Sequence, residues 1–192
     1  MTAVMLAALA PAQQADTTFA VEASRLEVTQ LEGTISITGW DRNEMRVQAA
    51  YDEDEGRLDI RQSGGIIHVS TKGEWGEPVY GELDLSVPRG IALEITGVSL
   101  DVGIEGPAGS VSVSTAEGEI VLVGGAGNVA LNAVDGPVTV AGASGKIAIN
   151  AVNGDVSVSE SDGAIAVTAV DGDVTLEGIT SDNVSVNAVD GD

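Results

Sequence analysis

The residues of this sequence that could bind a ligand chemically are acids that recur at a nearly constant spacing. One set contains Asp135, Asn153, Asp171 and Asp190, and the set two positions later contains Pro137, Asp155, Asp173 and Asp192. Carboxylates that repeat at strand spacing repel one another, and Ca²⁺ prefers carboxylate and carbonyl oxygens. The candidate calcium ligands are therefore Asp135, Asp155, Asp171 and Asp173. The alternative, that these acids are solvated turn residues, is favoured because the glycine-rich nonapeptide of calcium-binding repeats is absent.

A second candidate site is the segment Lys72–Glu82, which reads KGEWGEPVYGE and interrupts the spacing of the apolar segments. Its Trp75 and Tyr80 combine a large apolar area with a polar edge, so on an exposed loop they would anchor a sugar or a protein. The alternative, that the two rings close the start of the apolar interior, is favoured. Trp75 and Tyr80 are the candidate partner-binding residues of this sequence.

The chain has one histidine, His68, and no cysteine. A zinc site needs several His or Cys ligands and an activated nucleophile needs a neighbouring base, so neither can be assembled here. Paired carboxylates can hydrolyse glycosides, but among 30 Asp and Glu residues a close pair arises from composition alone. We predict that the protein is not an enzyme and has no catalytic or cofactor-binding residues.

Short strands must position the residues named above. From Leu26/Val28 to Val184/Val186, two aliphatic residues separated by one other residue recur, for the most part every nine or ten positions, with a gap at Lys72–Glu82. Alternation with a period of two predicts β-strands, and a fixed longer period predicts a repeat architecture.

From Gly97 onward, two such units form an 18-residue repeat, and Asp135-Gly136 is one of the dipeptides that mark its corners. Glycine supplies the positive φ that a tight corner needs. We predict an all-β fold, a parallel β-solenoid with coils of about 18 residues and two short strands per coil. A narrow aliphatic interior would explain why every aromatic residue of the chain lies between Phe19 and Tyr80, with none in the regular repeats.

An antiparallel meander of hairpins would also fit the nine-residue spacing. The solenoid is favoured because identities recur at 18 positions rather than at nine. The last position of the repeat reads Ser114, Asn132, Asn150, Thr168 and Asn187. Equivalent positions meet directly in a stack of coils, so this column predicts a ladder of side-chain hydrogen bonds.

The pattern divides the chain into three parts. Residues 1–15 contain the apolar run AVMLAALA and the motif Ala10-Pro11-Ala12, typical of the end of a secretory signal peptide; a disordered alanine-rich tail is the alternative. Residues 16–82 are predicted to form an N-terminal cap with irregular first coils, and residues 83–192 the regular coils. Because the last residues open another coil, we predict a C-terminal truncation or, less favoured, an edge that pairs with a partner, including a second copy end to end.

The net charge of −22 limits the partners of the protein. Lys146 is the only base after residue 96, so no basic patch is available to neutralise nucleic acid phosphates or to dock on anionic lipid. We therefore predict no nucleic acid partner and no direct binding to anionic membranes.

Three segments resemble a bacterial family known as the DUF4097 putative adhesins: Gly33–Asp41 (GTISITGWD), Met45–Val47, and Leu83–Gly90 (LDLSVPRG). The strands and Asp-Gly turns that follow fit the same family, and the similarity runs from about residue 20 to the end of the sequence. The resemblance implies a parallel β-solenoid on or near the bacterial cell envelope. It implies no catalytic or ligand-binding residues.

We therefore expect a secreted or envelope-held, extracytoplasmic protein without enzymatic activity, an adhesin or surface scaffold that binds a protein or a glycan at the cell surface. One alternative is a sensing or regulatory module of an envelope stress response. A second, disfavoured because the corners are too short to build a cleft, is an enzyme that acts on polysaccharides.

Overall fold

The computed structural model describes residues 13–51, 56–73, 79–107 and 109–191, which form β-strands and no helix. The first strands are β1 (Gln13–Ala20), β2 (Arg25–Thr29), β3 (Glu32–Trp40), β4 (Glu44–Tyr51), β5 (Gly56–Ser63), β6 (Ile66–Gly73), β7 (Tyr80–Pro88), β8 (Ala92–Thr96) and β9 (Ser99–Glu105). The remaining strands are β10 (Val111–Glu117), β11 (Ile120–Val123), β12 (Val129–Asp135), β13 (Val138–Ala141), β14 (Ile147–Asn153), β15 (Val156–Ser159), β16 (Ile165–Asp171), β17 (Val174–Glu177) and β18 (Val184–Asp190). Within these ranges no helix is long and apolar enough to cross a membrane.

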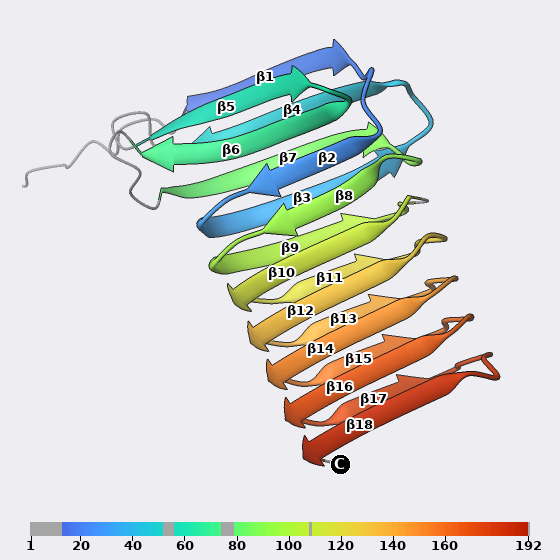
Figure 1. Cartoon of the computed structure of the whole chain (residues 1–192). Helices are drawn as coiled ribbons and strands as arrows, with labels where there is room; N and C mark the ends of the chain where they lie inside the picture. The colour runs from blue at the N-terminus through green and yellow to red at the C-terminus, as the bar shows by residue number, and fades with distance from the viewer. Residues whose placement is uncertain (1–12, 52–55, 74–78, 108, 192) are drawn as a thin grey trace, which may run out of the picture.

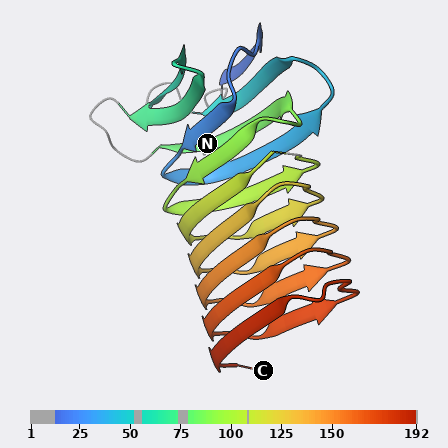
Figure 2. The same cartoon turned by 45° about the vertical axis from the view of Figure 1, so that its right-hand side comes forward.

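The strands pair in two ladders that form the walls of a column (Figure 1). The first ladder runs β5–β6–β2–β8–β10–β12–β14–β16–β18. The second runs β1–β4–β7–β3–β9–β11–β13–β15–β17. All of these pairs are parallel except β5–β6, β1–β4 and β4–β7. Figure 2 separates the two walls and shows β18 at the C-terminal end of the column. The predicted parallel solenoid is confirmed, and the meander is wrong for the regular coils.

The register of the regular coils follows the repeat of the sequence. Val111 lies opposite Val129, and the same column continues through Ile147 and Ile165, each in the equivalent position of the next repeat. The column ends at Val184, which the register still places opposite Ile165 although the two residues are 19 positions apart instead of 18. Alternate residues point inward, so the interior is an aliphatic stack that is closed to water as far as β16.

Glycine makes one corner of each coil possible. Gly136 has φ +131° and Gly154 has φ +150°, a region that residues with a side chain rarely adopt. A Cβ atom on Gly154 would also lie 2.2 Å from the carbonyl oxygen of Gly136 in the preceding coil. The stacking distance, as well as the turn itself, therefore requires glycine at this corner.

The N-terminal part does not stack in chain order. The coil of β2 and β3 lies between the coil of β6 and β7 and the coil of β8 and β9. Leu26 accordingly lies opposite Ile67 on one side and Leu93 on the other. The apolar pattern identifies each of these strands but not its neighbours, so the insertion could not be read from the sequence.

Candidate interaction surfaces

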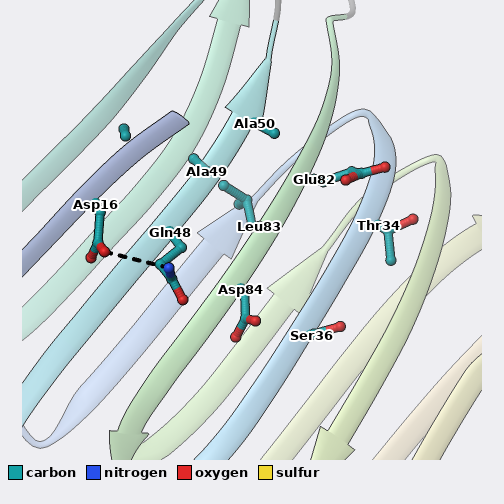
Figure 3. A pocket seen from close by; sticks show the side chains of 10 residues that line it. Asp16, Thr34, Ser36, Gln48, Ala49, Ala50, Glu82, Leu83 and Asp84 are labelled. Carbon is teal, nitrogen blue, oxygen red and sulfur yellow. Dashed lines mark hydrogen bonds between the residues drawn. The ribbon is translucent and has the colours of Figure 1, made fainter. Parts of the chain in front are cut away.

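A groove of about 450 Å³ lies on the outward face of the second ladder, where β1, β4, β7 and β3 meet (Figure 3). The register places Asp16, Gln48, Asp84 and Ser36 in one row across these four strands. A second row adds Ala50, Glu82 and Thr34. The groove is thus lined by carboxylates, an amide and hydroxyls, which suit a cationic or hydrogen-bonding partner.

Asp16 is held as an ionised carboxylate at the edge of this groove. Arg46 donates from Nε to Asp16 Oδ1 at 2.9 Å and from a terminal nitrogen to Oδ2 at 2.6 Å, and Gln48 Nε2 donates to Oδ2 at 3.4 Å. The hydrogen bonds from the Arg46 guanidinium lower the pKa of Asp16 below its ordinary value. A carboxylate held in this way is unsuited to donating a proton, so it fits binding rather than acid catalysis.

The sequence pattern did not identify the groove. Along β4 and β7 the polar residues of the groove alternate with buried aliphatic residues, and this alternation indicates only that the polar side chains point outward. They come together because β7 pairs with β3 on one side and antiparallel with β4 on the other. That pairing depends on the insertion of β3 into the column.

Tyr80 lies at the start of β7, 59% exposed, beside a second groove of about 460 Å³. Three carboxylates from three different strands line this groove: Glu32, Asp101 and Glu117. Tyr80 therefore does not fill the interior of the column, and its ring is accessible to a partner. Trp75, the other candidate, lies outside the described residues.

The corner acids named as candidate calcium ligands lie along one edge of the column, where some of them hydrogen-bond to the neighbouring coil. Asn153 Nδ2 donates to Asp135 Oδ1 at 2.9 Å, and the backbone N–H of Asp173 donates to Asp155 Oδ1 at 3.0 Å. Asp171 lies opposite Asn153 and Asp190 in the same edge. No group of three or more His, Cys, Asp or Glu side chains in the described part of the chain is placed to hold a metal ion. The favoured interpretation of solvated turn acids and the calcium alternative are distinguished by melting the protein with calcium and with a chelator.

A third surface is the outward face of β10, β12, β14, β16 and β18, which we call the uncharged face. Its central row is Ser114, Asn132, Asn150, Thr168 and Asn187. The row on one side is Ser112, Ala130, Ala148, Ala166 and Ser185, and the row on the other is Ala116, Val134, Val152, Val170 and Val189. The predicted ladder is confirmed at its start, since Asn132 Nδ2 donates to Ser114 Oγ at 3.3 Å and Asn150 Nδ2 to Asn132 Oδ1 at 3.0 Å.

His68 lies on β6, near the N-terminal end of the first strand ladder. It points away from the core, and its Nδ1 lies 3.0 Å from Glu27 Oε2. Glu27 is therefore a partner of His68 on the neighbouring strand β2. The pair is an exposed surface contact.

Comparison with known proteins agrees with this architecture. The family model described as Toastrack DUF4097 matches residues 10–192, almost the whole chain. The chain belongs to the Toastrack DUF4097 family. The resemblance of Gly33–Asp41 and Leu83–Gly90 to that family is thereby confirmed. No curated protein matches this Toastrack chain.

Several solved structures are similar to this Toastrack DUF4097 chain at low identity. A "putative cell adhesion protein" from Clostridium sporogenes is 11% identical, with a TM-score of 0.44 over 94% of this chain and 100% of its own. A "putative adhesin" from Parabacteroides distasonis is 10% identical, with a TM-score of 0.43 over 94% and 98%. Another "putative adhesin", from Bacteroides fragilis, is 11% identical, with a TM-score of 0.37 over 93% and 95%.

Proposed function

We propose that this Toastrack DUF4097 protein is an extracytoplasmic, non-enzymatic adhesin or surface scaffold that binds a partner at the cell envelope. The observation that carries the proposal is the uncharged face, where five successive coils present equivalent side chains in register. Repeat columns expose extended surfaces of this kind and commonly use them for binding. The names of the similar solved structures agree with such a role.

The grooves support binding rather than catalysis. The groove of Asp16 and Gln48 is open to solvent, and the Asp16 carboxylate is committed to Arg46. The groove beside Tyr80 combines carboxylates with an exposed phenol, an arrangement that suits recognition of a polar partner.

The test is binding of the purified protein to cell-envelope fractions of the bacterium that encodes it. We expect saturable binding to envelope fractions and little binding to the cytosolic fraction, measured by sedimentation of fluorescently labelled protein. Antibody detection of the native protein in fractionated cells should place it outside the cytoplasm.

Two results would contradict the proposal. One is an absence of saturable binding to every envelope fraction. The other is release of reducing sugar ends from envelope polysaccharide by the purified protein, which would identify an enzyme.

A further inference from the structure

The central row of the uncharged face continues beyond the regular coils. Ser114 lies opposite Thr96 on β8, Thr96 opposite Thr29 on β2, and Thr29 opposite Ser70 on β6. Together with the residues from β10 to β18, this makes one line of hydroxyl and amide side chains across eight adjacent strands. The line includes Thr29 only because β2 is inserted between β6 and β8, so it belongs to the folded column rather than to the sequence repeat.

The rows beside this line carry no charge from β10 onward. One holds only Ala and Ser, and the other holds Ala and Val. Val134, Val152 and Val170 are between 40% and 45% exposed, so the second row forms an apolar strip in contact with water. Such a surface contrasts with a net charge of −22 on the whole chain.

Charge determines which partners this face can accept. The corner next to the valine strip carries Glu117, Asp135, Asp171 and Asp190. An anionic partner that lay on the uncharged face would approach these carboxylates and be repelled. A cationic partner would find its counter-charges at the corner and not on the face itself. The face therefore matches an electrically neutral partner.

Hydrogen-bonding capacity narrows the chemistry further. Each Ser or Thr hydroxyl and each Asn amide can both donate and accept, as can the hydroxyls of a sugar. The valine strip offers an apolar surface for the C–H faces of sugar rings. We propose that the uncharged face binds an extended, uncharged polysaccharide, an inference that rests on the proposed envelope function and names its partner.

The flat geometry explains why the partner is a long chain. The two grooves described above lie on the second ladder and at its edge, and a third, of about 380 Å³, lies around Thr29 and Ser70 at the N-terminal end of the polar line, beyond the uncharged face. Equivalent side chains recur at about 4.8 Å, the spacing of adjacent strands. A polymer that contacts several rows at once adds many weak contacts, which a single sugar cannot do.

A second copy of this chain is a poorer occupant. Five strands at about 4.8 Å and about seven residues per strand give a face of roughly 500 Å². Two such faces would bury about 1,000 Å² in total, at the lower bound for a specific protein interface.

The test compares two double variants in the same coils. Ala130→Lys/Ala148→Lys places two long charged side chains on the uncharged face. Thr139→Lys/Ser157→Lys places the same charges on the outward face of β13 and β15, at positions that pair with one another in the same way. All four residues are half-buried and face outward, so the two variants add the same charge and should disturb folding to the same extent.

Binding is measured by electrophoresis in native gels that contain a neutral glucan, a neutral mannan or the anionic polymer polygalacturonate. We expect a neutral polysaccharide to retard the wild type, and the Ala130→Lys/Ala148→Lys variant to bind about tenfold more weakly, a loss of about 1.4 kcal/mol. The Thr139→Lys/Ser157→Lys variant should bind as the wild type does, and polygalacturonate should retard none of them. Far-UV circular dichroism checks that each variant is folded.

The inference is overturned if neither neutral polymer retards the wild type, if polygalacturonate alone does, or if both double variants bind equally. It is also overturned if sedimentation shows a dimer that only Ala130→Lys/Ala148→Lys disrupts, because a second copy then occupies the face. Envelope binding without binding to either neutral polymer would refute this inference and leave the proposed function standing.

Discussion

The regular coils from β10 to β18 and the N-terminal coil of β2 and β3 use the same aliphatic pattern with different connections. In the regular coils each strand pairs with the equivalent strand of the repeat before it or after it in the sequence. In the N-terminal coil, Ile35 lies between Leu83 and Val102, which are far from it in the sequence. The pattern therefore specifies that a residue points inward, whereas its neighbours depend on how the chain is routed.

The difference also concerns what each region contributes. The regular coils provide the uncharged face, which extends by repetition. The inserted coil joins the N-terminal strands to the column, and the groove in Figure 3 exists because β7 is flanked by β3 and β4. Binding surfaces of two kinds thus arise from one strand pattern.

The largest loss of stability is expected at Gly33, where the inserted coil packs against β7. Gly33 has φ +127°, and a Cβ there would meet the Gly81 carbonyl oxygen. Gly33→Ala should therefore lower the free energy of unfolding by more than about 4 kcal/mol, as both a clash and backbone strain are introduced. Urea denaturation followed by circular dichroism measures the loss.

Gly64→Ala is the matched control, because Gly64 also has a positive φ (+62°) but no atom within 4 Å of its added Cβ. It should lower the free energy of unfolding by about 1–2 kcal/mol. Equal losses for the two variants would show that close packing against β7 contributes nothing.

Truncating one buried leucine in each region tests which strands pack next to it, those close in the sequence or those distant from it. Leu26 and Leu131 are both fully buried, so truncating either to alanine should lower the free energy of unfolding by about 2–5 kcal/mol. Hydrogen exchange should show weakened protection of β6 and β8 in Leu26→Ala, and of β10 and β14 in Leu131→Ala. Unchanged exchange in β6 and β8 after Leu26→Ala would contradict the inserted topology.

The hydrogen-bond ladder of the regular coils should have a smaller effect. Asn132 both donates to Ser114 and accepts from Asn150, so Asn132→Ala removes two partly exposed bonds. We expect a loss of about 1 kcal/mol, measured by thermal and urea denaturation. Thr139→Ala, on the opposite wall of the same coil, should change stability by less than about 0.5 kcal/mol. A loss no greater than that control would show that the ladder orders the face without stabilising it.

The smallest effect concerns the exposed pair of Asp16 and Arg46. Because the folded state lowers the pKa of Asp16 below 3.8, the pair stabilises the protein above that pH, and the contribution disappears as pH falls through the lowered pKa. Asp16→Asn should thus slightly lower the melting temperature at neutral pH, and the difference from wild type should vanish in acid.

The variants Asp16→Asn, Arg46→Met and Asp16→Asn/Arg46→Met together form a double-mutant cycle, which measures the interaction energy between the two side chains. If the deficit of Asp16→Asn persists unchanged in acid, its cause is not the ionised pair.

The sequence was sufficient for the features that repetition controls. The 18-residue period predicted the register of the regular coils and the side-chain ladder to which the contact between Asn132 and Asn150 belongs. In these coils each position meets its own equivalent, so the local pattern contains the tertiary contact. The corner glycines were predicted for a different reason, the positive φ that a tight corner needs.

The binding surfaces were harder to predict because they join residues from unrelated strands. Tyr80 was recognised as a candidate, but its neighbours Glu32 and Asp101 were not, since nothing in the pattern indicates that β3 lies between β7 and β9. The pattern likewise does not indicate that Thr29 and Ser70 lie side by side, because it does not show that β2 pairs with β6.

The inserted coil also determines how the column responds to a mechanical load. Among the described strands β18 forms its ladder with β16 alone, so a pull on that strand breaks one set of ladder hydrogen bonds. The coil of β2 and β3 is bonded on both sides, and a pull along its strands has to shear two sets of hydrogen bonds together. Pulling β18 away would therefore break one set of hydrogen bonds, whereas pulling out the inserted coil would break bonds to strands from two distant parts of the sequence.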